Sequence, residues 1–330
     1  MLQAFYGWHS FNFDSQHVYD SAKVVSVDAT CNGTQLTLSG VPRKPGNPNA
    51  PDSLYFQYEN LFWRNNHWVP ADTVEAFPDT TNVFNLQPIY SESLDLVVYD
   101  ARPDSTGEYS EESVVIDTTL HDMKAYSFHL TYEVEARGGK DELTNEMNRP
   151  VSDSVLIGLS APFTVLFHAN PTPRASYIDW NILLGASPAT TARHDSTFRY
   201  TFTGSEDAQA YTVTLHCQDK SNSCELPTQT VAVSVALSKL LVPNVFTPNG
   251  DGLNDEFRVL YQSLKEFHIW VYNRWGKQVF STDNPDTGWD GYISGQKAAE
   301  GAYFYVIRAK GEDGQVYKLG GDINLIRGNN

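Results

Sequence analysis

The side chains of this sequence that are best equipped for chemistry lie in one short stretch, VPNVFTPNGDGLND at residues 242–255. Carboxylate and amide oxygens are the ligands that Ca²⁺ prefers, although the bidentate glutamate that closes an EF-hand loop is missing here. Asn and Asp also hydrogen-bond their own main chain, and glycines between them permit positive φ, so a tight turn fits equally well. We favour the turn and keep a bound cation as the alternative. The oxygen donors are Asn249, Asp251, Asn254 and Asp255.

A catalytic site is not predicted. The nine histidines are scattered, and the sequence holds no HExxH, GxSxG or phosphate-loop pattern. His9 and Ser10 are neighbours in sequence, which does not make a triad, and Glu111–Glu112 fits a solvated strand edge. We therefore expect no enzyme activity and no cofactor.

The pairing of the three cysteines indicates whether the protein folds in an oxidising compartment. Cys217 and Cys224 enclose six residues, a short loop that a disulfide could close in an oxidising compartment, with two thiols as the alternative. The first interpretation leaves Cys31 over as a buried apolar residue. A CxxC spacing for zinc is absent.

Composition sets the class of protein. The chain has 330 residues and a formal net charge of −17, from 23 Lys and Arg against 40 Asp and Glu. This charge argues against nucleic acid and anionic membrane surfaces as partners. No apolar run reaches the roughly 18 residues of a membrane span. The first residues lack a signal-peptide pattern, and we expect that a signal peptide has been removed.

Short β-rich runs alternate with Gly, Pro, Asn, Asp and Ser along the whole chain, and convincing helical periodicity is missing. The fold class predicted is all-β, with tandem immunoglobulin-like β-sandwiches. We expect an N-terminal tail at residues 1–19, a first sandwich at 20–120, a second at 121–238 and a third module at 239–330. The third module's predicted strands are Phe257–Leu260, Phe267–Asn273, Lys277–Ser281, Ala302–Lys310 and Gln315–Ile326.

The central region resembles a polycystic-kidney-disease-type immunoglobulin-like domain over residues 155–237. The resemblance rests on Ala161–Val165 (APFTV), Tyr177–Trp180 (YIDW) and Ala210–Leu215 (AYTVTL). It implies a sandwich with Trp180 in its core.

Four motifs follow in order in the last ninety or so residues: PNVFTPNGDGLND from Pro243, YNRWG from Tyr272, GWDG from Gly288 and GAYFY from Gly301. This set resembles the gliding-motility-associated C-terminal domain, the type B sorting domain of the type IX secretion system of Bacteroidota. The resemblance implies transit through the periplasm, passage through the outer-membrane translocon with a PorP/SprF-type partner, and an end at the cell surface or in the medium. The candidate sorting residues are Asn249, Asp251, Asn254, Asp255, Asn273, Arg274, Trp275, Trp289 and Asp290.

Two of these residues, Arg274 and Trp275, fall at a predicted hairpin tip. An exposed Arg and Trp there suit partner recognition, and a cation–π contact within the domain is the equal alternative.

Asp-Ser and Asp-Thr dipeptides recur before the third module and resemble the periplasmic O-glycosylation signal of Bacteroidota. Such dipeptides also start turns, which is the plainer interpretation. The candidate sites are Ser21, Ser53, Thr73, Ser105, Thr118, Ser154 and Ser196.

The predicted function is that of a non-enzymatic exported protein that acts at or through the outer-membrane secretion machinery and binds a protein or glycan. One alternative is a carbohydrate-binding surface protein with a platform of Tyr58, Trp63 and Trp68. Another is a regulatory or structural component that the machinery retains.

Overall fold

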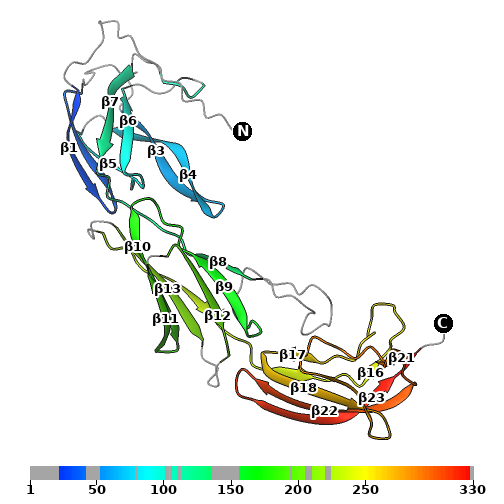
Figure 1. Ribbon diagram of the computed structural model, residues 1–330. Helices are drawn as coiled ribbons and strands as arrows, with labels where there is room; N and C mark the ends of the chain where they lie inside the picture. The colour runs from blue at the N-terminus through cyan, green and yellow to red at the C-terminus, as the bar shows by residue number, and fades with distance from the viewer. Residues whose placement is uncertain are drawn as a thin grey trace. The chain divides into compact units, whose positions relative to one another are not determined.

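The computed structural model describes residues 22–41, 53–78, 81–100, 104, 106–109, 113–135, 156–193, 195–204, 210–219 and 224–327, and every regular element in them beyond single turns is a β-strand (Figure 1). Within these residues, no helix has the length and apolar character needed to cross a membrane. The predicted all-β class is confirmed. The chain divides into two compact units, the first made of Met1–Phe128, Asn170–Tyr177 and Cys217–Leu226, the second of the remainder. The four predicted segments and the three boundaries between them stay a prediction.

The first unit contains a sandwich of two antiparallel sheets. One sheet has the order β1 (Lys23–Thr30), β2 (Gly33–Ser39), β5 (Val83–Leu86). The other has the order β4 (His67–Pro78), β3 (Ser53–Arg64), β6 (Ser93–Tyr99), β7 (Val114–His121). Alternate residues of these strands point inward, as the period of two requires, and rings such as Phe56 and Phe84, with centroids 4.8 Å apart, fill the core.

The three rings predicted for a sugar platform differ in burial. Tyr58 is only 2% exposed, and its hydroxyl donates to Glu75. Burial, followed by the Glu75 contact, raises the Tyr58 pKa. Trp68 is half-buried and donates its indole N–H to the Asn170 carbonyl at 2.9 Å, with Trp63 edge-on to it. Tyr58 is therefore closed to a ligand, whereas Trp63 and Trp68 are only half-buried, and the sugar platform stays a prediction.

The cysteine pairing differs from the prediction. Cys224 forms a disulfide with Cys31, while Cys217 is buried and forms none. A bridge pairs Gln218 with Glu225, so Cys217 and Cys224 are diagonal neighbours in the ladder. Diagonal residues lie about 7–8 Å apart, beyond the usual separation of bonded cysteines. Cys31, in the turn between β1 and β2, comes within a Cα–Cα distance of 5.6 Å of Cys224.

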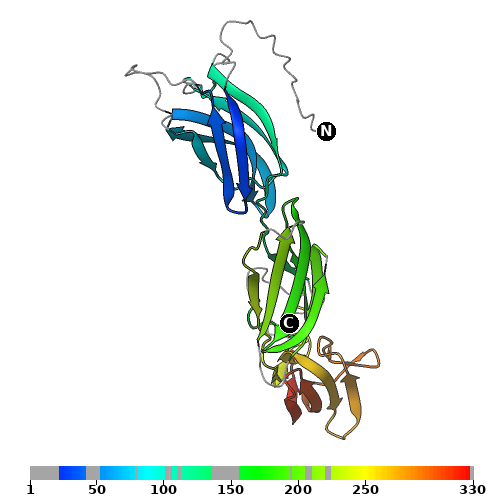
Figure 2. The same ribbon diagram turned by 90° about the vertical axis from the view of Figure 1, so that its left-hand side faces the viewer.

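A second sandwich is built from two further sheets. The larger has the order β11 (Ser187–Arg193), β10 (Ala175–Leu184), β13 (Tyr211–Asp219), β14 (Gln229–Val233). The smaller has the order β12 (Thr197–Phe202), β9 (Phe163–His168), β8 (Thr131–Val134) (Figure 2). Trp180 is 1% exposed and donates its indole N–H to the Asp195 carbonyl, which confirms its predicted place in the core.

The third module is organised by a five-stranded sheet. Its order is β16 (Val245–Phe246), β23 (Val316–Leu325), β22 (Gly301–Gly311), β18 (Leu264–Tyr272), β19 (Gln278–Thr282), with β16 parallel to β23. Two small sheets complete it: β15 (Lys239–Leu241) with β17 (Leu260–Gln262), and β20 (Tyr292–Ile293) with β21 (Gln296–Lys297). Four of the five predicted strands match β18, β19, β22 and β23 to within a few residues. The fifth, Phe257–Leu260, is wrong in its bounds, because Phe257 forms only an isolated bridge and β17 begins at Leu260.

Ser263, between β17 and β18, joins the third module to the rest of the second unit. The residue is fully buried with a φ of 46°. Its hydroxyl donates to the Ala236 carbonyl at 2.6 Å and accepts from the Ala161 N–H, while its N–H donates to Ser160 Oγ. These hydrogen bonds satisfy the buried hydroxyl of Ser263 and hold the backbone in place where β18 begins.

Candidate functional site

The loop between β16 and β17 is held by one carboxylate. Asp255 Oδ1 accepts from the N–H groups of Asn249 and Gly250 at 3.0 and 2.7 Å, and Oδ2 accepts from Gly252 at 2.8 Å. Both glycines have positive φ, +86° and +85°, which lets the chain wrap around the carboxylate. These hydrogen bonds from backbone N–H groups hold the pKa of Asp255 below its usual range, and the bond from Gly250 has the largest effect.

The other polar side chains of the loop also serve the backbone. Asp251 Oδ1 accepts from the Leu253 N–H at 2.8 Å, and Asn249 Oδ1 accepts from the Asp251 N–H at 3.0 Å. Among the described residues, no group of three or more His, Cys, Asp or Glu side chains is placed to hold a metal ion. Because the loop's own N–H groups occupy the oxygens, the geometry supports the hydrogen-bonded turn.

Trp289, from the GWDG motif, fastens this loop to the core. Its ring lies 5.4 Å from Phe246 and 4.8 Å from Tyr303, and its main chain exchanges two hydrogen bonds with Phe257. Trp289 is 1% exposed, so it positions the loops from within the core, and its place among the candidate sorting residues stays a prediction. Asp290 is exposed and accepts from the Tyr292 N–H at 2.9 Å.

The YNRWG motif forms the hairpin tip between β18 and β19. Asn273 Oδ1 accepts from the N–H groups of Trp275 and Lys277, both at 3.0 Å, and Gly276 takes a φ of +77°. Arg274 lies over the Trp275 ring with Cζ 5.3 Å from the centroid. Trp275 is nevertheless 80% exposed, so the intramolecular cation–π contact leaves most of the ring open to solvent, and its recognition role stays a prediction.

Arg327 links the segment after β23 to the motifs, a role that sequence reasoning did not predict. Its Nη2 donates to the Gly291 carbonyl at 2.8 Å, its Nη1 donates to Ala298 O, and its N–H donates to Glu300. A Cβ at Gly291 would lie 3.0 Å from Arg327 Nη2, so only glycine fits there comfortably. An arginine directly after the final strand was the available signal.

A second arginine that sequence reasoning missed lies beneath the GWDG turn. Arg258 has no exposed side-chain area and pairs with Asp286 at 3.4 Å, and Tyr261 also donates to that carboxylate at 2.8 Å. A buried cation needs such partners. The Arg258–Asp286 pair holds the segment that leads into Gly288.

The four motifs therefore meet at one end of the third module. Phe246 and Trp289 contact through their rings, and a Cβ at Gly291 would lie 3.1 Å from Pro248. A Cβ at Gly301 would lie 3.4 Å from Arg274 Nη2, which links YNRWG to GAYFY. The described groups here form a rigid, partly exposed surface suited to binding.

The candidate glycosylation sites differ in access. Ser21, Ser105 and Ser154 lie outside the described residues. Ser196 is exposed in a bend, whereas the hydroxyl oxygen of Thr73 in β4 is buried. Ser53 and Thr118 are half-buried at the start of β3 and within β7.

Comparison with protein families assigns the third module. Residues 240–320 match the CHU_C type IX secretion signal domain, which confirms the C-terminal resemblance. The chain thus carries a type IX secretion C-terminal signal, which implies recognition by the secretion machinery and export to the cell surface or the medium. No curated protein sequence matches the chain significantly.

Comparison with solved structures returns tandem β-sandwich proteins. The FN1–FN3 domains of chicken CNTN1 have 11% identity and a TM-score of 0.32, over 92% of this chain and 96% of that one. A tetra-tandem repeat from the extending region of a large adhesion protein has 14% identity and a TM-score of 0.23, over 92% and 73%. The two-domain fibronectin type III segment of chicken tenascin has 11% identity and a TM-score of 0.24, over 65% and 97%. Scores this low carry no argument about function.

Proposed function

We propose that the type IX secretion signal domain at residues 240–320 addresses a non-enzymatic protein, whose preceding sandwiches bind a protein or glycan partner outside the cell. The observation that carries the proposal is the convergence of four sequence motifs on one end of the signal domain. Buried groups such as Trp289 and Arg258 make that end rigid. A rigid surface loses little conformational entropy on binding, as a recognition signal requires.

The contact with a PorP/SprF-type outer-membrane partner is assigned to the hairpin tip. Trp275 combines a large exposed ring with a neighbouring guanidinium, and Trp and Arg are enriched among residues that dominate binding energy. Leu253, 69% exposed at the tip of the loop that Asp255 holds, is a second apolar contact. Asn273 and Asp255 act as positioning residues because their side chains bond the backbones beneath these tips.

The altered pKa values among the described residues follow from packing and pairing. Most of the groups with altered pKa among the described residues are tyrosines such as Tyr99 and Tyr303, whose pKa burial raises. The pKa of Glu135 is lowered by its hydrogen bonds to Arg199, an exposed cross-strand pair. Each of these shifts has a structural cause, and none of them accompanies a nucleophile with an adjacent base.

A binding role for the first sandwich is supported by a tyrosine cluster on the outer face of its larger sheet. Tyr99 and Tyr109 stack with centroids 4.1 Å apart, and Tyr55 lies 5.9 Å from Tyr109. All three are half-buried. Tyrosine offers contact area at low entropic cost together with a hydrogen-bonding tip, which suits both protein and glycan partners.

The test is deletion of residues 239–330 in a host with type IX secretion, with surface display measured by protease accessibility on intact cells. We expect the truncated chain, which lacks residues 239–330, to stay folded in the periplasm. The full chain should reach the surface. The matched gain-of-function arm fuses residues 239–330 to a periplasmic reporter, which should then appear outside. Unchanged display of the deleted chain would contradict the proposal. Full chain that co-purifies with outer membranes as a stable complex would instead indicate a retained component.

A further inference from the structure

The outer face of the five-stranded sheet begins at Tyr272 and Phe304, from the YNRWG and GAYFY motifs, and continues along the strands away from the motif loops. Along β18 and β22 the alternate side chains point away from the core, and they pair across the strands. Trp270 lies opposite Val306, and Tyr272 lies opposite Phe304. His268 lies opposite Arg308 one pair further along.

Strand β23 extends these rows. Lys318 lies opposite Arg308, and Gly320 lies opposite Val306. A Cβ at Gly320 would meet nothing closer than 3.5 Å, so the neighbourhood does not demand glycine. The missing side chain leaves Val306 uncovered on that side.

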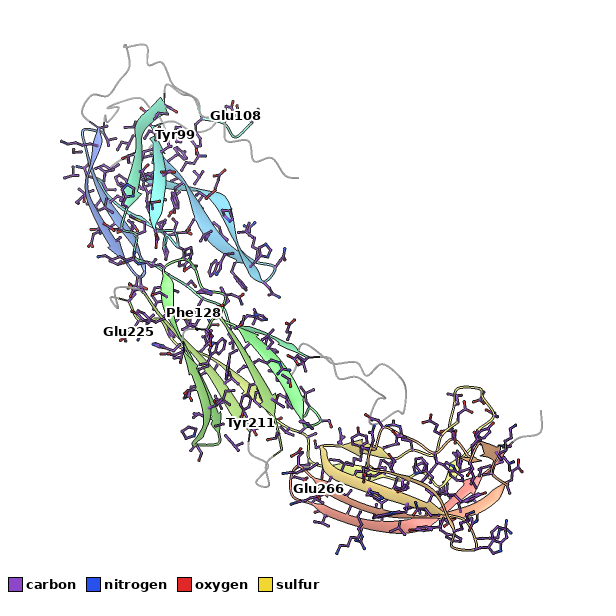
Figure 3. All side chains as sticks on the ribbon, in the orientation of Figure 1. Tyr99, Glu108, Phe128, Tyr211, Glu225 and Glu266 are labelled. Atoms are coloured by element: carbon purple, nitrogen blue, oxygen red, sulfur yellow. A yellow bond between two sulfur atoms is a disulfide. The ribbon has the colours of Figure 1, made fainter. Side chains whose placement is uncertain are left out.

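The face carries more apolar surface than a solvent-facing antiparallel sheet requires, since such faces are usually polar. Phe304, Val306 and Val316 are 46%, 41% and 55% exposed. They adjoin an open groove of about 730 Å³ that Trp270 and Arg308 help to line. Glu266, labelled in Figure 3, stands at the end of the same groove. Exposed apolar side chains gathered on one face, with basic Arg308 and Lys318 between Val306 and Val316, suit an interaction surface.

The charge around this patch is opposite to that of the chain. Lys265, Arg308, Lys310 and Lys318 line the groove, against two carboxylates, Glu266 and Asp283. Asp283 is already in contact with His268. Residues 1–128 hold seventeen acidic and six basic side chains, whereas residues 239–330 hold eleven and ten. The groove therefore holds four basic against two acidic side chains, while Asp322 lies opposite Phe304 at the other end of the face.

We propose that this face, formed by Trp270, Phe304, Val306, Arg308, Val316 and Lys318, docks an acidic polypeptide segment of the outer-membrane partner that receives the signal domain. The inference rests on the proposed function and adds a second contact surface to it. An extended segment that alternates acidic and apolar side chains matches the rows of basic and apolar residues.

Other occupants fit the face less well. An anionic membrane would be repelled by a chain of net charge −17 and by the carboxylates at the groove rim. A sugar ring would need an open aromatic face, but His268 lies with its centroid 3.9 Å from that of Trp270, and Arg308 Cζ lies 6.0 Å from the same ring. These contacts cover the indole.

The export test uses the full chain with three double substitutions at one pair of positions. Arg308→Glu with Lys318→Glu should lower surface display by about tenfold or more, since like charges then oppose the partner. Arg308→Gln with Lys318→Gln should lower it less, and Arg308→Lys with Lys318→Arg should leave it near wild type. The matched control, Lys239→Glu with Lys297→Glu, makes the same charge change at exposed positions of the same module and should have no effect. If the two glutamate substitutions lower the Tm of the purified chain, the proposal is judged on the two glutamine substitutions. Unchanged surface display in that glutamine variant then overturns it.

The outcomes separate the two proposals. If deletion of residues 239–330 abolishes display but no Arg308 and Lys318 variant changes it, this inference is overturned and the proposed function stands. A loss in the control pair equal to that in the test pair also overturns it.

A binding arm with purified full chain identifies the chemistry of the occupant. The probes are a short synthetic peptide that alternates Glu with Val and Phe, the same peptide with Gln for Glu, and phosphatidylglycerol vesicles. We expect salt-sensitive binding of the Glu peptide that the Arg308→Glu and Lys318→Glu pair removes. Equal binding of both peptides overturns the acidic assignment. Vesicle binding that the same pair removes overturns the polypeptide assignment.

Discussion

Cys31 and Cys224 form a disulfide that joins the β1–β2 turn to the segment after β13, across 193 residues of sequence. Closing so long a loop restricts the unfolded chain, which stabilises the fold by up to about 5 kcal/mol in the chain-entropy model. Replacing Cys31 with Ser should therefore lower the Tm of the transition that unfolds the first sandwich. Scanning calorimetry with and without reductant measures the change.

Peptide mapping under non-reducing conditions checks the pairing itself. We expect a linked pair of peptides that contain Cys31 and Cys224, with Cys217 alkylated only after denaturation because it is buried. Cys217→Ser is the control and should retain the link. A Cys217–Cys224 peptide in the native protein would contradict the observed pairing.

The loop that Asp255 holds should loosen in acid. The folded pKa of Asp255 is lowered by its amide hydrogen bonds, so its contribution to stability is present above the unfolded pKa of about 3.9. That contribution is lost as the pH falls through the folded pKa. Hydrogen exchange at Gly250 and Gly252 should accelerate in this range. Asp255→Asn should show the faster exchange at neutral pH, and protection that is unchanged in this variant would refute the role of the charge.

Two tryptophans of the signal domain should separate stability from recognition. Trp289→Ala removes a ring that is 1% exposed and should cost about 3–5 kcal/mol of unfolding free energy in urea. Trp275→Ala removes a ring that is 80% exposed and should leave the urea midpoint nearly unchanged while it reduces surface display. Surface display of the Trp275→Ala variant at the wild-type level would show that the hairpin tip is not part of the recognition surface.

Access should select among the glycosylation candidates if modification follows folding. Ser196 is exposed, so it is the described candidate most open to a transferase, whereas the buried hydroxyl of Thr73 is closed to one. Mass spectrometry of the protein from a Bacteroidota host should find glycan on the peptide with Ser196 and none on the peptide with Thr73. Glycan on Thr73 would indicate modification of the unfolded chain.

Local patterns predicted the strands of the third module well. The alternation in Phe267–Asn273 and Ala302–Lys310 and the glycines of the turns act over a few residues, so they survive in any all-β packing. Side-chain roles were harder to predict. Trp289 and Trp275 are the same residue type beside a glycine, and only the packed core distinguishes the anchor from the exposed ring.

The sequence by itself determined the all-β class, the order of the four motifs and the turn chemistry of Asn249–Asp255, because these depend on the chain's period and on neighbours within a few positions. Tertiary structure alone decided that Cys224 bonds Cys31, that Arg327 joins three segments, and that basic and apolar residues of β18, β22 and β23 share one face. Such pairings depend on strand register and on which distant segments meet, and these are set by the burial of the whole core.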